Sequence, residues 1–365
     1  MNKLKKMSTS DKLLDNYYQG VPTLVTGGAS FIGSALVELL VARGAKITVA
    51  DNLSSGTLDN LQDVRDKICL LKGDLRDPGF AACAARNQQI VFHLAAAHGG
   101  RGYIDSHPVE CTNNMLLDHI VFDAVTAAGA LRIVYASSAC VYPTNLQQDT
   151  IERILLRETD AGFDRAGRAF ADGEYGWAKL MGELQLRAFH RQHGVDGIVA
   201  RIFTAYGERE NETHAVIALV AKALARYDPY PVWGDGTQTR NFTYVGDTVY
   251  GLALAGAHLS GFRAINLGTD RHHTINELIE EIFHLLGWHP DRLDYQLDRP
   301  VGVKSRASDN TKITRMLNWS PNTGLREGLR RTIQWYRPLA TAERLANLES
   351  QLTRREVDPE LTVTP

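Results

Sequence analysis

A glycine-rich turn near the start of the chain, between a strand pattern and a helix pattern, constrains the fold most strongly. Residues 22–26 form a short apolar run, residues 26–33 read TGGASFIG, and residues 34–44 follow a helical pattern that ends at Gly44. The backbone N–H groups of such a turn, together with the start of the helix, can hold a pyrophosphate. The turn therefore indicates the first unit of a dinucleotide-binding α/β domain.

The same alternation of strand and helix continues along the chain. Strand-like runs recur at residues 46–51, 67–75, 90–96, 131–138 and 197–203, and helical patterns separate them. Alternation of this kind predicts a parallel sheet with helices on both faces. The expected fold class is α/β: a Rossmann-type, doubly wound parallel sheet with a smaller C-terminal α/β substrate lobe.

The alternation loosens after about residue 204. A helical stretch at 214–227 precedes a turn-rich segment at 233–242, and a strand-like run at 262–268 leads into a helix at 274–287. We read these segments as a smaller lobe interleaved with the first domain. The predicted units are a Rossmann domain at 20–203 rejoined by 241–268, a substrate-binding lobe at 204–240 and 269–340, and a tail at 341–365.

Composition and charge exclude several classes of protein. The 365 residues are 44% hydrophobic and 22% charged, which excludes disordered, collagen-like and coiled-coil chains. Lys and Arg number 40 against 42 Asp and Glu, so no net field favours nucleic acid or an anionic membrane. The basic N-terminus precedes no apolar run, and no stretch of about 18 apolar residues occurs. We therefore expect a cytoplasmic protein with no membrane or nucleic-acid partner.

The four cysteines show no spacing typical of a metal site. They are Cys69, Cys83, Cys111 and Cys140, and a chain of this length with so few thiols is expected to keep them reduced. No metal site is predicted.

The glycine-rich turn and the acid that follows it favour NAD. Gly27 would make the tight turn, and Gly33 would let the helix pack closely against the strand. Ser30 takes the middle glycine position of a TGxxGxxG pattern; its Cβ crowds the phosphate, and its hydroxyl could donate a hydrogen bond in return. Asp51 ends the second strand about 20 residues on, where it can accept from both ribose hydroxyls and repel a 2′-phosphate.

A tyrosine and a lysine four residues apart indicate acid–base chemistry. Tyr175 and Lys179 lie in a helical pattern, so both project from one face. An ammonium beside a phenol is expected to lower the phenol's pKa and make it a usable base. Ser138 ends a strand at the carboxyl edge of the sheet, where ligands bind. Together they predict one catalytic site.

Motifs along most of the chain resemble one family. TGGASFIG, DNLSSG, GDLRD, FHLAA, YASSACVYP, YGWAK and RNFTYVGD look like the extended short-chain dehydrogenases/reductases that act on nucleotide sugars. The resemblance covers roughly residues 21–336 and implies that Ser138, Tyr175 and Lys179 move a hydride from sugar C4 to NAD. Besides Tyr175 and Lys179, the NAD contacts it implies are Gly27, Ser30, Phe31, Ile32, Gly33, Asp51, Asn52, Ser54, Asp74, Leu75, Leu94, Ala95, Ala96 and Asn113.

Longer segments are similar to the GDP-mannose 3,5-epimerase branch of that family. They are YASSACVYP, GGRGYI, WGDGTQTRNFTY and GVKSRASDNTKITRMLNWSPNTGLREGL. The resemblance implies that Cys140 is an acid or base on carbons beside C4, and a thiol is easily tuned for that task. The branch uses a lysine as the second acid or base, and our closest placement puts His214 there. A small buried cysteine and an exposed histidine at a helix start are the plain structural alternatives.

The same resemblance supplies the substrate contacts. Arg240 and Arg306 match arginines that grip a nucleotide diphosphate, for which a guanidinium fork is well suited. Gly100 and Arg101 fall in the GGRGYI segment, and Ser138 serves substrate as well as catalysis. Thr204 stands where the family has an asparagine, which leaves the identity of the base and the sugar open.

Two rival functions remain at this point. A 4-epimerase needs only Ser138, Tyr175 and Lys179, and the DNLSSG segment is more like those enzymes. A non-catalytic NAD-binding sensor would need neither the tyrosine nor the lysine, which weighs against it. A 4,6-dehydratase is disfavoured because Ala139 and Cys140 stand where dehydratases carry an Asp-Glu pair. The family implies a homodimer.

Overall fold

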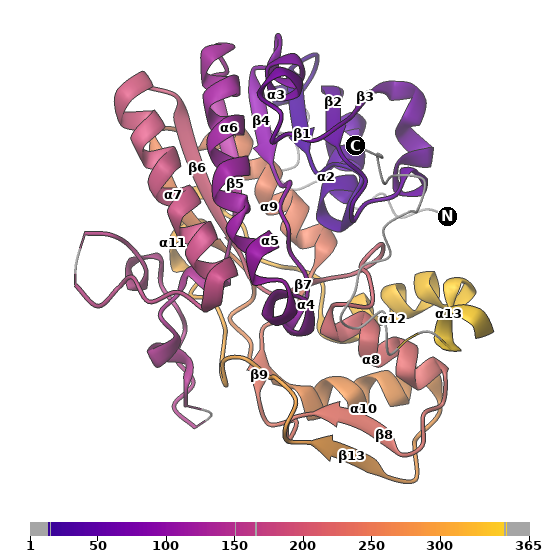
Figure 1. Cartoon of the computed structure of the whole chain (residues 1–365). Helices are drawn as coiled ribbons and strands as arrows, with labels where there is room; N and C mark the ends of the chain where they lie inside the picture. Colours follow the sequence, from indigo (N-terminus) through magenta and orange to yellow (C-terminus); the bar gives the residue numbers. More distant parts are fainter. Residues whose placement is uncertain (1–13, 15, 150, 165, 347, 349–365) are drawn as a thin grey trace.

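Seven parallel strands form the central sheet (Figure 1). The computed structural model describes residues 14, 16–149, 151–164, 166–346 and 348. The strands lie in the order β3-β2-β1-β4-β5-β6-β11, and every neighbouring pair is parallel. In chain order they are β1 (Pro22–Thr26), β2 (Lys46–Asp51), β3 (Ile68–Lys72), β4 (Ile90–His93), β5 (Arg132–Ser138), β6 (Asp196–Ile202) and β11 (Phe262–Leu267).

The strand order confirms the predicted doubly wound α/β fold. The chain winds from β1 outward to β3, and then from β4 outward in the opposite direction. Sheets of this kind bind ligands beyond the carboxyl ends of the strands, at the point where the winding reverses. The ends of β1 and β4 therefore mark the expected place of the site.

Helices cover both faces of the sheet. One face carries α2 (Phe31–Ala42) and α9 (Val245–His258); the other carries α3 (Pro78–Ala85), α6 (Asn114–Ala127) and α7 (Gly173–His193). Neighbouring residues of β1 illustrate the two cores, because Val25 packs on the first face and Leu24 on the second. Since both faces are buried, the strands read as continuous apolar runs instead of alternating ones.

A second core lies in the lower part of Figure 1, away from the sheet. It is built from α8 (Ala215–Leu224), β8 (Tyr230–Trp233), α10 (Ile275–Leu286), β13 (Leu293–Gln296) and α12 (Leu325–Tyr336). Strands β8 and β13 pair in parallel. The predicted helix at 274–287 is α10; Thr274 caps its start in a reciprocal pair with Glu277, and Gly287 follows its end in a left-handed conformation.

The remaining elements are short. They are α4 (Arg101–Ser106), α5 (Pro108–Thr112), β7 (Ala205–Tyr206), β9 (Thr239–Arg240), β10 (Thr243–Tyr244), β12 (His273–Thr274), α11 (Thr311–Leu317) and α13 (Ala342–Ala346), with 3₁₀ turns at Leu58–Lys67, Ala139–Val141, Thr144–Gln147, Glu158–Asp160 and Arg337–Leu339. Pairs β7–β10 and β9–β12 form two small sheets.

The division into lobes stays a prediction, and one part of it differs from the observed packing. We placed residues 269–340 in the lobe, but Ile313, Leu317 and Trp319 pack into the core of the large sheet, beside α9. Of the predicted tail, residues 347 and 349–365 lie outside the described residues. In the part of the chain that is described, no helix combines the length and the apolar character needed to cross a membrane.

Candidate active site

A cavity of about 360 Å³ opens between the carboxyl edge of the sheet and the second core. Its walls come from the glycine-rich turn, the ends of β4, β5 and β6, and residues of α7, α8 and the segment around residue 302. The predicted site residues that line it are Ser30, Phe31, Ile32, Gly33, Leu94, Ala96, Gly100, Arg101, Ser138, Cys140, Tyr175, Lys179, Thr204, His214, Arg240 and Arg306.

The glycine-rich turn passes close beneath β4. Gly27 has a φ of +67°, and a Cβ there would lie 2.8 Å from the backbone nitrogen of Ala95. A side chain at residue 27 would therefore strain the backbone and would push apart the segments that follow β1 and β4. The start of α2 remains open to the cavity, so the turn fits the pyrophosphate of a dinucleotide.

Ser30 uses its hydroxyl differently from what the sequence suggested. Its Oγ donates to the carbonyl oxygen of Gly27 at 2.6 Å, which closes the turn on itself. We expected the hydroxyl to donate to a phosphate. Ser30 occupies the N-cap position of α2 and lines the cavity.

Asp51 ties the second strand to the turn. Its Oδ2 accepts from the backbone of Ala29 at 2.9 Å, and its Oδ1 accepts from the backbone of Leu53 at 2.8 Å. Burial raises the pKa of Asp51, and these two hydrogen bonds oppose that rise. Each carboxylate oxygen can accept a second hydrogen bond, so the predicted contact with ribose hydroxyls remains compatible with this geometry.

Several predicted NAD contacts do not line the cavity. These residues are Gly27, Asp51, Asn52, Ser54, Asp74, Leu75, Ala95 and Asn113. The contact of Asn113 with NAD stays a prediction, and its neighbour Asn114 is engaged elsewhere. The side chain of Asn113 is exposed, whereas Asn114 is buried and its amide exchanges two hydrogen bonds, of 2.7 and 2.9 Å, with the backbone of Ala97.

Tyr175 and Lys179 lie on one face of α7 and reach the cavity beside Ser138. Gly176 lets α7 pack closely against the turn that carries Cys140, because a Cβ at residue 176 would collide with the carbonyl oxygen of Cys140. Burial raises the pKa of Tyr175, and a hydrogen bond with Ser138 opposes the rise. We expected Lys179 to lower this pKa, but its Nζ lies 6.0 Å from the centre of the Tyr175 ring and burial dominates.

The Tyr135 ring and the Asp118 carboxylate stabilise the charge of Lys179. Its Nζ lies 4.8 Å from the centre of the Tyr135 ring, whose hydroxyl donates to Asp118 at 2.5 Å. Burial lowers the pKa of Lys179 and the Asp118 carboxylate opposes this effect. Gly182 makes room for the arrangement, because a Cβ there would collide with the Tyr135 hydroxyl and with Asp118.

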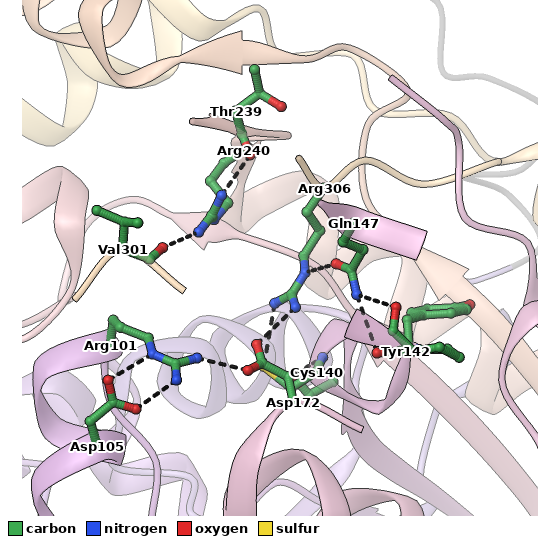
Figure 2. Close-up of polar contacts among 12 residues, drawn as sticks. Arg101, Asp105, Cys140, Tyr142, Gln147, Asp172, Thr239, Arg240, Val301 and Arg306 are labelled. Carbon is green, nitrogen blue, oxygen red and sulfur yellow. Dashed lines mark hydrogen bonds and ion pairs between the residues drawn. The ribbon is translucent and has the colours of Figure 1, made fainter. Parts of the chain in front are cut away.

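Cys140 lies directly after β5, in a short 3₁₀ turn. Its backbone nitrogen donates to Ser138 Oγ at 3.1 Å. Nη1 of Arg306 lies 3.3 Å from the Cys140 sulfur, and Nη2 of Arg306 pairs with Asp172 at 3.0 Å (Figure 2). The structure thus brings Arg306 to the thiol, a contact that the sequence did not predict. Its contact with a diphosphate stays a prediction.

The other two predicted arginines lie nearby. Arg240 donates to the carbonyl oxygens of Thr239 at 2.8 Å and Val301 at 2.7 Å, and burial beside Arg306 lowers its pKa to about 10. Arg101 pairs with Asp105 and with Asp172, each at 2.8 Å. Three guanidinium groups therefore meet at one wall of the cavity (Figure 2).

His214 precedes α8 and lines the cavity with a partly exposed side chain. Its Nδ1 lies 3.5 Å from Oε1 of Glu210, which is buried and whose pKa burial raises well above the usual range. Among the described residues, Oε2 of Glu210 is a buried oxygen with no hydrogen-bond partner. Glu210 can thus orient the imidazole through its other oxygen.

Sequence reasoning missed Asp172 and Glu210. Asp172 stands three residues before Tyr175, a place that reads as an ordinary helix cap, and Glu210 reads as one of several loop acids. Their spacing from Tyr175 and His214 was the available signal. Away from the cavity, Glu280, His284 and His289 are exposed and bring possible metal-ligand atoms within 4.8 Å of one another. We had predicted no metal site from the cysteine spacing, which carries no information on this group.

Comparisons with known proteins agree with this geometry. Residues 23–268 match the model of the NAD dependent epimerase/dehydratase family. The chain is 31% identical to GDP-mannose 3,5-epimerase 1 of Oryza sativa subsp. indica, over 89% of this chain and 84% of that one. It is 29% identical to UDP-glucose 4-epimerase of Mycolicibacterium smegmatis, over 86% and 98%.

A solved structure extends the agreement to three dimensions. An epimerase from Methanothermobacter thermautotrophicus superposes with a TM-score of 0.78 at 27% identity, covering 95% of this chain and 99% of that one. The family match, the parallel sheet and the cavity at its carboxyl edge all point to one conclusion. The chain belongs to the NAD-dependent epimerases and dehydratases that act on nucleotide sugars, and NAD is its cofactor.

Proposed function

We propose that the protein is a nucleotide-sugar epimerase of the GDP-mannose 3,5-epimerase type, which oxidises C4 transiently and inverts C3 or C5. The observation that carries the proposal is the meeting of two sets of groups in one cavity. Ser138, Tyr175 and Lys179 serve the C4 hydroxyl, and Cys140 and His214 are additional groups that can move protons. A 4-epimerase has no use for the second set.

The first set prepares the C4 hydroxyl. Tyr175 takes the proton of O4, with Ser138 holding the same oxygen and Lys179 beside them on the same face of α7. NAD, when bound, accepts the C4 hydride and later returns it. The glycine-rich turn and the start of α2 would hold its pyrophosphate, and Asp51 its ribose. The resulting 4-ketone acidifies the C–H bonds at C3 and C5.

The second set exchanges protons at those carbons. A base removes the proton, and the electron pair of the C–H bond forms an enolate with the ketone. An acid then delivers a proton to the other face, which inverts the centre. Cys140 and His214 fill these two roles, and both recover their starting states by exchange with water.

The wall of the cavity that carries Arg101, Arg240 and Arg306, here called the arginine wall, supports a nucleotide diphosphate as the part of the substrate that the protein grips. Arg240 and Arg101 line the cavity and can donate charged hydrogen bonds to the anionic oxygens of a diphosphate. Thr204 also lines it and offers a hydroxyl where the family has a longer amide. The cytoplasmic location expected from the sequence and the homodimer implied by the family both stay predictions.

A 4-epimerase remains the second candidate, because the M. smegmatis relative is matched almost as closely as the O. sativa one. The two are distinguished by incubating the protein with GDP-mannose, or with UDP-glucose, in heavy water and following the products by NMR. We expect inversion and deuterium at C3 or C5 of GDP-mannose. Inversion of UDP-glucose at C4 alone, with no deuterium in the sugar, would establish the 4-epimerase instead.

A further inference from the structure

All three nitrogens of the Arg306 guanidinium are bonded within the protein. Nη1 contacts the sulfur of Cys140 at 3.3 Å, Nη2 pairs with Asp172 at 3.0 Å, and Nε donates to Gln147 Oε1 at 2.7 Å (Figure 2). Arg306 is only 7% exposed. A buried guanidinium requires acceptors on its N–H groups, so the cysteine sulfur serves as one of three fixed partners.

Gln147 holds the arginine segment as well as its side chain. The backbone oxygen of Gln147 accepts from Lys304 at 3.0 Å and from Ser305 at 3.1 Å. Its Nε2 donates to the carbonyl oxygens of Tyr142 and Pro143, at 3.2 and 3.1 Å. The segment that carries Arg306 is therefore anchored to the loop that follows Cys140, which keeps the guanidinium at the sulfur.

Asp172, at the start of α7, holds both Arg306 and the turn that carries Cys140. Its backbone nitrogen donates to the carbonyl oxygen of Cys140 at 2.8 Å. An aspartate at the N-cap usually accepts from the first turn of its helix, but the Asp172 side chain makes no such bond and instead pairs with Arg101 and Arg306. Burial acts to raise the pKa of Asp172, yet the two arginines lower it overall, so it stays ionised.

Four charged and titratable groups act on the sulfur, and they come from the Arg306 segment, β9 and α7. Arg306 touches it, and Arg240 from β9 interacts with it electrostatically. Tyr175 faces it from α7 and Asp172 lies beyond Arg306. Arg306 is the cation in direct contact with the sulfur, and a neighbouring cation favours the thiolate form.

We propose that Arg306, positioned by Asp172 and Gln147, holds Cys140 as a thiolate, so that Cys140 enters the reaction as the base. The thiolate then takes the proton from the carbon beside the ketone and becomes a thiol, and the C–H electron pair enters the enolate. His214 supplies a proton to the opposite face. The catalytic role rests on the proposed function; the state of the sulfur does not.

Alkylation tests the thiolate without substrate or turnover. Purified protein is treated with iodoacetamide across pH 5 to 9, and each cysteine peptide is followed by mass spectrometry. Cys69 and Cys83 are exposed and serve as internal comparators. We expect Cys140 in the wild type to be alkylated down to a lower pH than either comparator. In Arg306→Gln its midpoint should rise by about one pH unit, a change of about tenfold in thiolate fraction near neutrality.

Two further variants make the result decisive. Arg306→Lys keeps the charge and loses the fork, so its midpoint should fall between those of the wild type and Arg306→Gln. Arg326→Gln removes a surface arginine that pairs with Glu281 at 3.0 Å, and should leave the Cys140 curve unchanged. A wild-type Cys140 curve that follows those of Cys69 and Cys83, or a curve indifferent to Arg306→Gln, overturns the proposal whatever reaction the enzyme performs.

Discussion

The two halves of the candidate active site are built in opposite ways. Tyr175 and Lys179 project from one helix and rest on a buried network in the Rossmann domain. The Cys140 half is assembled from α4, the turn after β5, the start of α7 and the segment around Arg306. The first half can be recognised from local spacing, whereas the second exists only once distant segments have folded together.

The largest expected effect comes from a substitution in the half of the site that projects from α7. Tyr175→Phe removes the proton acceptor for O4 and leaves the arginine wall intact. We expect a loss of about 10²–10⁴-fold in kcat with little change in substrate binding. Steady-state turnover of the nucleotide sugar measures kcat, and calorimetric titration measures substrate binding. A near-normal kcat would remove Tyr175 from the mechanism.

A smaller effect tests whether α7 joins the two halves. Gly176→Ala places a methyl group against the carbonyl oxygen of Cys140. Overpacking of this kind costs about 1–3 kcal/mol in free energy of unfolding, which urea denaturation would measure. Gly162→Ala, where a Cβ meets nothing within 4 Å, is the matched control. Equal stability of the two variants would show that α7 does not need this close approach.

The smallest expected effect concerns the ionisation of Asp172. Its two arginines lower the pKa of this carboxyl in the folded state, so its charge stabilises the fold above the unfolded value of about 3.9. This contribution is lost as the pH falls through the lower, folded value. Asp172→Asn should therefore destabilise the protein at pH 7, with the difference from wild type shrinking below about pH 4. A difference that is constant with pH would argue for a purely steric role.

These differences explain how much could be read from the sequence. The parallel, doubly wound sheet followed from the alternation of strand-like and helical patterns, and the Tyr175 and Lys179 pair followed from the helical repeat. The sequence did not show which of Asn113 and Asn114 is buried, because a one-residue shift changes the face of a helix and leaves the local pattern almost unchanged; Asn114 is the buried one, and its amide bonds to the backbone of Ala97.

The partners of Arg306 could not be predicted for a different reason. Cys140 and Arg306 stand 166 residues apart, and no local pattern links them. Nor does any pattern show that the Asp172 side chain leaves its helix for two arginines. Burial decides both contacts, since a guanidinium enclosed by the fold must bond to whichever acceptors surround it.

The central claim is that one cavity performs hydride transfer and proton exchange with separate groups. Cys140→Ala tests it most directly when NADH absorbance and deuterium uptake from heavy water are recorded together with GDP-mannose as substrate. We expect the variant to reduce its NAD transiently, as the wild type does, while deuterium at C3 and C5 and the yield of epimer fall by about 10²-fold or more. Wild-type levels of deuterium and epimer in Cys140→Ala would contradict the claim.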